Sequence, residues 1–257
     1  MGIAELQVSS VEEADGAGGV CIVRCIGGIA RTGQLYAAAG SRLVLRRIEW
    51  YGRESAFLDA AHSAKVHLSG AIVPLLGQFQ VISSIPVAAL SLTDAEFWLA
   101  DGTPPAKAQD LHTLRALGNT RMQDDRLPQG ERIRWARVQL AAIERMGLAP
   151  LVAAIDAAQV RACLIRYLGP EPDRGGGDGL RDPAGLCCFV LDRTGIGPDR
   201  ALRDGRVWRD LEPERILHLR RLKLLTASLE AARPHLADDH PLAATVDAWR
   251  RVRRQLP

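Results

Sequence analysis

Apolar and polar positions alternate through the first third of the chain, which predicts β-structure. Val20–Ile26 is rich in β-branched residues, and a Gly27-Gly28 pair separates it from Leu35 and Tyr36. β-Branched residues favour strands, and glycine supplies the positive φ angles of tight hairpin turns without steric cost. Further strands are predicted at Leu43–Tyr51, Ala64–Gly70 and Gln78–Ile82. Short strands at this spacing are typical of a small closed β-barrel, which we expect over residues 16–83.

The pattern changes after this predicted barrel. Ile85–Leu92 is apolar enough for another strand or an extended strap, although Pro86 excludes a central strand position. Thr93-Asp-Ala-Glu96 resembles a capping box that would start a short helix, and the Asp101–Pro105 turn would end it. We therefore predict a β-barrel domain at residues 1–92 and a mainly α-helical domain at residues 93–257, an α+β chain.

From Gln109 onward a period of about 3.6 residues replaces the alternation, which predicts amphipathic helices. Gly147 and Pro150 separate the first two helices, as a C-terminal cap and a first-turn proline do. Pro213 is a favourable start for a later helix, and a last helix follows near the C-terminus. The four apolar stripes are Ile133, Ala136, Leu140 and Ile143; Leu151, Ile155, Ala158, Ala162 and Ile165; Ile216, Leu219, Leu222, Leu225 and Leu229; and Leu242, Val246, Trp249, Val252 and Leu256.

Three segments of the second half are predicted to be non-helical. Residues 169–185 are rich in glycine and proline and predict a surface loop. We interpret Gly175–Gly179 in it as a linker, because a phosphate-binding loop should follow a strand and open a helix. Leu186–Leu191 is a continuous apolar run, which predicts a buried strand or strap paired with residues 85–92. Asp204-Gly205 predicts a turn.

The barrel segment resembles a known module. The glycines at 16, 18, 28 and 33, Arg24, Ile48-Glu49, and Gly70 followed by Gly77-Gln78 are similar in spacing to the second domain of translational GTPases such as elongation factor Tu. The resemblance covers roughly residues 6–83, about a third of the chain. It implies a barrel that in this family packs on the GTPase domain and contacts ribosomal RNA and the aminoacyl end of tRNA.

The chain departs from that family where binding matters. The acidic-acidic-x-Phe stretch of the family falls on Ser9, Ser10 and Glu12, and Ala17 replaces the arginine between the two early glycines. Aminoacyl-tRNA recognition of the usual kind is therefore not expected. The sequence also contains no G-x-x-x-x-G-K-[ST] loop to cradle phosphates, so we expect neither a GTPase domain nor a nucleotide cofactor.

Composition narrows the class of protein further. With 257 residues and 47% hydrophobic content, the chain can bury a sizeable core without disulfides. Its cysteines are odd in number and lie in apolar runs, which indicates buried thiols in a reducing compartment. No apolar run is long enough for a membrane span, so a cytoplasmic protein without membrane contact is expected. The five cysteines are Cys21, Cys25, Cys163, Cys187 and Cys188.

Candidate catalytic and metal-binding residues are sparse. The six histidines include no i, i+4 pair that could share a metal on a helix face, and Cys187-Cys188 has no further cysteine at zinc spacing. The carboxylates of Asp124-Asp125 and Asp238-Asp239 flank turns, where exposed aspartate is common. We therefore expect no catalytic residues, no metal and no cofactor. These absences favour a non-enzymatic protein over an enzyme.

Basic residues of the last helices are the strongest binding candidates. The formal charge of +3 is small, but the basic excess lies downstream of the barrel and is densest between residues 249 and 254. Such side chains can contact phosphates, or they can simply solvate the outer face of a helix. Trp50-Tyr51, Trp208 and Trp249 could be stacking anchors or core residues. The predicted binding residues are Arg220, Arg221, Lys223, Arg250, Arg251, Arg253 and Arg254.

These observations favour a non-enzymatic binding or adaptor protein that uses the barrel and contacts RNA, the translation machinery or a protein partner. One alternative is a partner-dependent subunit of a protein assembly. The other is an enzyme whose site assembles at the barrel–helix interface from separated residues. The candidate members of such a site are Asp192, Arg193, Asp204 and His218.

Overall fold

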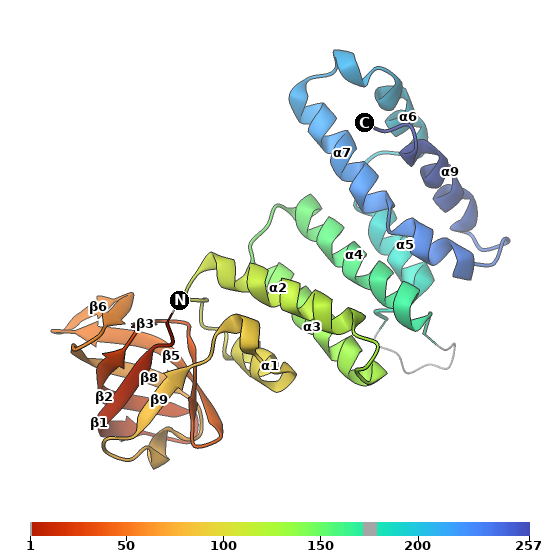
Figure 1. The fold of residues 1–257 in the computed structure, drawn as a ribbon. Helices are drawn as coiled ribbons and strands as arrows, with labels where there is room; N and C mark the ends of the chain where they lie inside the picture. Colours follow the sequence, from red (N-terminus) through yellow and green to blue (C-terminus); the bar gives the residue numbers. More distant parts are fainter. Residues whose placement is uncertain (1, 172–178) are drawn as a thin grey trace. The chain divides into compact units, whose positions relative to one another are not determined.

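The computed structural model describes residues 2–171 and 179–257, which form two compact units, Met1–Leu117 and Gly118–Pro257 (Figure 1). The first unit extends past the predicted strand-to-helix boundary at residue 92, because the helix that follows it packs on the barrel. Within the described ranges, no helix has both the length and the apolar character needed to cross a membrane.

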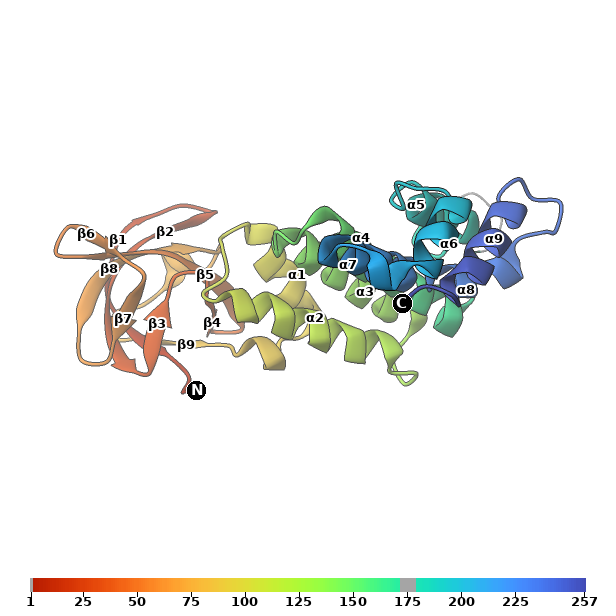
Figure 2. The ribbon, with the colours of Figure 1, turned by 90° about the horizontal axis from the view of Figure 1, so that it is seen from above.

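A closed antiparallel β-barrel forms the core of the first unit, as the sequence predicts. Its hydrogen-bonded strand order is β4-β9-β1-β2-β8-β5, and the β4–β5 pairing closes the ring of six strands. Figure 2 shows these strands curving around one core. Closure matters because it leaves no strand edge of the ring exposed for pairing with another chain. The six strands are β1 (Glu5–Ala14), β2 (Gly18–Gly27), β4 (Leu35–Ala38), β5 (Ser41–Trp50), β8 (Ser63–Ser69) and β9 (Val81–Ser84).

Three short strands lie outside the ring. β6 (Arg53–Ser55) extends β5 as a hairpin, whereas β3 (Ile29–Arg31) and β7 (Phe57–Asp59) form a separate two-stranded sheet. Alternate side chains of the ring strands fill the barrel core; on β2 these are Cys21, Val23 and Cys25. The predicted alternation is therefore confirmed.

The sequence analysis missed β1. This strand pairs with both β2 and β9, but register shifts between Val8 and Ser10 and between Val11 and Glu13 mark irregularities in its ladder with β2. A bulge inserts an unpaired residue and turns the following side chains to the other face. The apolar-polar alternation of β1 is lost for that reason in its second half.

Residues 85–92 are not a strand, so that part of the prediction is wrong. The chain forms the 3₁₀ turn η2 (Val87–Ala89) and then enters helix α1 (Leu92–Asp101). The capping box exists, but it uses Ser91 and Asp94 instead of Thr93 and Glu96: the Asp94 N–H donates to Ser91 Oγ, and the Ser91 N–H donates to Asp94. Both boxes have the same spacing, which is why the sequence pattern placed the helix two residues too late.

Side chains of α1 tie it to the barrel. Trp98 is 3% exposed and donates its indole N–H to the carbonyl of Gly33 at 2.7 Å. Arg42 of β5 forms an ion pair with Asp94, and Ser69 of β8 donates its hydroxyl to Asp101. Burial alone would raise the pKa of Asp94, but the hydrogen bonds from Arg42 and Ser91 hold it below its usual range. These contacts explain why the compact first unit includes α1.

Gly33 permits a close approach between two loops of this unit. Its φ is +82°, and a Cβ at this position would lie well under 3.0 Å from the backbone of Pro104. Only glycine fits such a position without strain. The residue that accepts the Trp98 hydrogen bond is therefore also the residue against which the 104–106 segment packs.

The second unit is helical, as predicted. Helix α2 reaches into it from the first unit, and α3 and α4 pack side by side as the predicted helical hairpin. Gly147 has a φ of +62°, and Pro150 stands at the first turn of α4, so both predicted boundary residues are confirmed. The helices of the described residues after α1 are α2 (Ala108–Gln123), α3 (Gln129–Arg145), α4 (Pro150–Leu168), α5 (Pro183–Leu191), α6 (Pro198–Arg206), α7 (Pro213–Thr226), α8 (Leu229–Ala232) and α9 (Ala243–Arg253).

One core joins α4 to the five helices that follow it. The predicted apolar stripes on α4, α7 and α9 all contribute buried residues, among them Ala158, Leu222 and Trp249. Figures 1 and 2 show α6 beside α9, where Gly205 of α6 packs near Leu256. The predicted turn at Asp204-Gly205 is therefore wrong, since both residues lie inside α6.

Leu186–Leu191 is helical, which corrects the predicted strand. Asp182 caps α5 by accepting hydrogen bonds from the N–H groups of Ala184 and Gly185, both at 2.9 Å, and Pro183 occupies the first turn. An uninterrupted apolar run has no period that distinguishes a strand from a helix, and here the cap decides. Residues 172–178 of the predicted loop at 169–185, including Gly175–Gly177, lie outside the described residues, and the loop ends earlier than predicted because α5 begins at Pro183.

The five cysteines are free thiols, and their burial is uneven. Cys21, Cys25 and Cys187 are buried as expected, but Cys163 is only partly buried and Cys188 is exposed. Burial raises the pKa of Cys21 to about 11 and that of Cys187 to about 12. Adjacent residues of a helix point about 100° apart, so Cys188 leaves the core that Cys187 enters.

Candidate binding sites

The predicted basic residues of α7 and α9 fall into two groups. Glu230 accepts hydrogen bonds from Arg250 at 2.9 Å and from Arg253 at 3.1 Å, and Arg250 also pairs with Asp247. Burial alone would raise the pKa of Glu230, but the two arginines hold it below its usual range. Arg250 and Arg253 therefore join α9 to α8 and are already engaged within the unit.

Lys223 also has an internal role. Its ammonium donates to the backbone carbonyl of Leu256 at 2.7 Å, which fixes the C-terminal end of the chain to α7. Lysine near a chain or helix end can satisfy a free carbonyl in this way. This contact leaves Lys223 less available than the other predicted residues.

The other four predicted residues have no acidic partner among the residues that the structure describes. Arg220, Arg251 and Arg254 are exposed and Arg221 is partly buried. Buried residues of α7 such as Leu219 and Leu222 occupy one side of the helix, so Arg220 and Arg221 share the opposite, solvent side with Leu217 and Leu224. The structure thus separates a group of available guanidinium groups from a group engaged in packing.

Sequence reasoning missed four further arginines, on α6 and the turn that follows it. Ala201 and Gly205 are the buried residues of α6, and its exposed side carries arginines at steps of three. None of them has an acidic partner in the described part of the chain, and Arg209 lies 5.6 Å from the ring of Trp208. The helical pattern could have identified them, had the Asp204-Gly205 pair not been taken as a turn. These residues are Arg200, Arg203, Arg206 and Arg209.

An aromatic surface lies at the β5–β6 turn of the barrel. Tyr51 is 91% exposed, and the Trp50 ring lies 5.6 Å from it and 5.1 Å from the ring of His62. A hollow of about 660 Å³ opens beside these rings and is lined also by Glu49 and Lys65. Exposed rings of this kind present faces on which other planar groups can stack.

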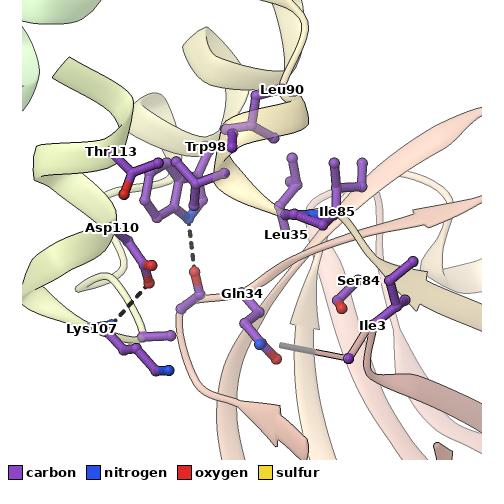
Figure 3. Close-up of a pocket in the computed structure, with 16 residues that line it drawn as sticks. Ile3, Gln34, Leu35, Ser84, Ile85, Leu90, Trp98, Lys107, Asp110 and Thr113 are labelled. Atoms are coloured by element: carbon purple, nitrogen blue, oxygen red, sulfur yellow. Dashed lines mark hydrogen bonds between the residues drawn. The ribbon is translucent and has the colours of Figure 1, made fainter. Parts of the chain in front are cut away.

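A smaller cavity of about 230 Å³ lies within the first unit, between the barrel and the α1 and α2 segments (Figure 3). Figure 3 shows Leu35 and Ile85 on the barrel side, with Trp98 and Asp110 on the helical side. Its walls are mainly apolar and include Leu90. The 104–106 segment and the Trp98 hydrogen bond to Gly33 hold these walls in place.

Two polar side chains of this cavity have unused hydrogen-bonding capacity. Oδ2 of Asp110 accepts from the backbone N–H of Lys107 at 3.0 Å, whereas Oδ1 accepts no hydrogen bond from the described residues. Oε1 of Gln34 accepts from the Arg31 N–H and the Tyr36 hydroxyl, which leaves the Gln34 amide N–H groups without an acceptor in the described chain. Burial raises the pKa of Asp110 above its usual range. The cavity therefore offers an acceptor at Asp110 and a donor at Gln34, and Ser84 and Lys107 also line it.

Two of the four residues named for an enzymatic site, Asp204 and Arg193, have other contacts. Asp204 pairs with Arg215 at 2.9 Å, and the Arg193 guanidinium stacks 3.8 Å from the ring centre of Phe189. Of the turn carboxylates, Asp124 pairs with Arg126, whose hydrogen bonds lower the pKa of Asp124 to about 2. Across the described ranges, no three His, Cys, Asp or Glu side chains form a group that could hold a metal ion.

Comparisons with known proteins find distant structural matches. No family model matches the chain, and no curated protein does. Apo translation elongation factor SelB from Methanococcus maripaludis matches with 14% identity and a TM-score of 0.30, over 32% of this chain and 19% of that one. GDP-bound aIF5B from Aeropyrum pernix matches with the same identity and TM-score, over 54% of this chain and 22% of that one. The chain thus spans about a fifth of the length of two translational GTPases that it distantly matches in structure.

Proposed function

We propose that this chain is a non-enzymatic, cytoplasmic binding protein that contacts RNA of the translation machinery, with a translation-factor-like barrel and a basic helical unit. The observation that carries the proposal is the set of exposed arginines on α6, α7 and α9, and directly after α6 and α9, that lack an acidic partner in the described chain. The set comprises Arg200, Arg203, Arg206, Arg209, Arg220, Arg251 and Arg254, with the partly buried Arg221 beside them.

Electrostatics favours a polyanion as the ligand of this set. Residues 198–257 carry basic side chains in excess, and four acidic residues of the segment, including Glu230 and Asp247, are already engaged in ion pairs. When an unpaired arginine binds a phosphate of a nucleic acid, a counterion condensed on that nucleic acid is released into solution. This release favours binding and makes the affinity dependent on salt concentration. Arginine also matches phosphate geometry with two parallel hydrogen bonds.

The barrel supplies a second feature that supports RNA over a folded protein partner. Tyr51 exposes its aromatic ring at one end of the barrel beside the partly buried Trp50. Arg53 in the paired strand and Arg24 on β2 are exposed without an acidic partner in the described residues. Unstacked bases of single-stranded RNA stack on such rings at about 1–3 kcal/mol per base. Protein surfaces with these rings usually bury them in a complementary pocket instead.

Fluorescence anisotropy with labelled single-stranded RNA at several salt concentrations tests the proposal. We expect the Arg220→Gln, Arg221→Gln, Arg251→Gln and Arg254→Gln variant to bind more weakly and with a shallower salt dependence, by about 0.7 in the log–log slope per lost contact. Arg126→Gln is the matched control, because this arginine is exposed but paired with Asp124. Glu212→Gln with Glu214→Gln removes two exposed acids at the start of α7 and should strengthen binding.

Equal RNA affinity of the quadruple variant and the wild type would contradict the proposal. So would binding that does not depend on salt. A pull-down from lysate with and without ribonuclease complements this assay: loss of captured ribosomal components on nuclease treatment supports RNA contact. A protein partner retained after nuclease would favour the alternative of an assembly subunit.

A further inference from the structure

The arginine set and the aromatic surface at the β5–β6 turn are both exposed. The cavity of Figure 3 differs from them because it is preformed and mainly apolar. Its volume of about 230 Å³ exceeds the roughly 150 Å³ of an apolar protein cavity known to accept benzene. It is smaller than pockets for drug-sized ligands, which begin at about 300 Å³. A compound of one or two rings fits this range.

The walls are fixed by contacts that are present without any ligand. Trp98 cannot rotate away without breaking its hydrogen bond to Gly33, and the 104–106 segment is held against Gly33 by a backbone contact that leaves no room for a side chain. On the opposite side, the Ile85 N–H donates to the Leu35 carbonyl at 2.8 Å, which keeps the end of β9 on β4. A preformed site binds its ligand without a cost for ordering side chains.

The polar groups of the cavity restrict the chemistry of the ligand. Oδ1 of Asp110 can accept a hydrogen bond, and the Gln34 amide can donate one. The lining includes both the Asp110 carboxylate and the basic Lys107, so its charges favour neither an anionic nor a cationic ligand. The apolar walls formed by Leu35, Ile85 and Leu90 disfavour a strongly hydrated one. A planar ring that carries both an N–H donor and an acceptor atom satisfies each of these conditions.

We propose that this cavity is a binding site for an uncharged nitrogen-containing aromatic compound of one or two rings, whose N–H donates to Asp110 and whose ring acceptor receives a hydrogen bond from Gln34. The ring lies between Trp98 and the aliphatic side chains of Leu35 and Ile85. The site is independent of RNA binding, because none of its residues belongs to the basic set of the helical unit.

Isothermal titration of the full chain with two bicyclic probes of similar shape tests the proposal. Benzimidazole has an N–H donor and a ring acceptor, whereas benzothiophene has neither. We expect benzimidazole to bind about tenfold more tightly, since a hydrogen bond to a charged group contributes about 1.5 kcal/mol or more. In Asp110→Asn, which keeps an oxygen for the Lys107 N–H, this preference should fall to less than about threefold.

Ala106→Leu places extra carbon atoms in the cavity and should abolish binding of both probes. Ala244→Leu on the exposed side of α9 is the matched control and should leave both affinities unchanged. Asp239→Asn, an exposed aspartate without a partner in the described chain, controls for the charge change.

Three results would overturn the proposal. They are no saturable binding of benzimidazole to the wild type, equal affinity of the two probes, and binding to Ala106→Leu that matches the wild type. Ala106→Leu could fail to bind because it lowers the stability of the first unit. Asp110→Asn changes no buried apolar contact, so its effect on the preference between the two probes still tests the proposal in that case.

Discussion

The fold of the barrel and the fold of the helical unit are each stabilised by a different kind of internal contact. The barrel depends on pairings between strands far apart in sequence, such as β4 with β9 and β1 with β9, and on close backbone approaches at glycine. The helical unit depends on apolar stripes that pack through large side chains such as Trp249. The difference teaches that one unit is sensitive to backbone geometry and the other to side-chain volume.

The largest expected effect is in the helical unit. Trp249→Ala removes a fully buried ring from the core that joins α4 to α9, and we expect a loss of about 3–5 kcal/mol in unfolding free energy. Hydrogen exchange with mass spectrometry should show faster exchange in residues 183–257 and unchanged exchange in the barrel strands. Equal acceleration in both units would contradict the comparison.

A smaller but substantial effect is expected at the backbone contact of the barrel. In Gly33→Ala, the new Cβ would be strained by the φ of +82° and would clash with the Pro104 backbone. We expect the unfolding free energy to fall by about 2–4 kcal/mol and the Trp98 hydrogen bond to Gly33 to break. Chemical denaturation and the near-ultraviolet circular dichroism of tryptophan measure both effects. Gly130→Ala in the first turn of α3 is the control, because its Cβ would meet open space, and its stability should change by less than about 1 kcal/mol.

The ion pair between α1 and the barrel should give a pH-dependent effect. The pKa of Asp94 is lower in the folded state than the unfolded value of about 3.9, so its contribution is present above that value and is lost as the pH falls through the folded pKa. Asp94→Asn should therefore cost about 2 kcal/mol at pH 7, and this difference should shrink below about pH 4. Denaturation at pH 3 and pH 7 measures it, and a difference that grows toward acid would refute the assignment.

The smallest effects separate the two groups of arginines. Arg250→Gln with Arg253→Gln breaks the hydrogen bonds to Glu230 and should cost about 1 kcal/mol, whereas Arg220→Gln with Arg221→Gln should change stability by less than about 0.5 kcal/mol. Thermal unfolding of the two double variants compares them directly. Similar losses would mean that Arg220 and Arg221 are also engaged in packing.

Much of the barrel could be predicted because its turns demand glycine and its strands alternate. Val20–Ile26, Leu43–Tyr51 and Ala64–Gly70 all coincide with strands, within a few residues. β1 could not be found in this way, since the irregularities after Val8 and Val11 break the alternation. Closure between β4 and β5 also depends on register, which no local pattern specifies.

The helical unit shows where local information is ambiguous. The stripes around Gly147 and Pro150 predicted α3 and α4, but the short run Leu186–Leu191 has no period, and its helical state follows from the cap at Asp182-Pro183. The sequence signal that could have predicted this helix is Asp182-Pro183, because aspartate before proline is a common helix start.

The candidate sites were only partly predictable from the sequence. The arginines of α7 and α9 could be named, yet their division depends on where Glu230 and Asp247 lie after folding. The cavity brings together side chains as distant in sequence as Ile3, Gln34 and Asp110. No spacing along the chain encodes such a meeting, since it results from the packing of α1 on the barrel.

The uneven burial of the cysteines gives the protein a built-in attachment point for a spectroscopic label. Cys188 is exposed on α5, whereas its neighbour Cys187 faces the core and has a pKa raised to about 12. Thiolate is the form that reacts with maleimides, so the buried thiols are slow to react. A single fluorophore on Cys188 would report on the helical unit once the partly buried Cys163 is replaced by serine, while the three buried cysteines can stay.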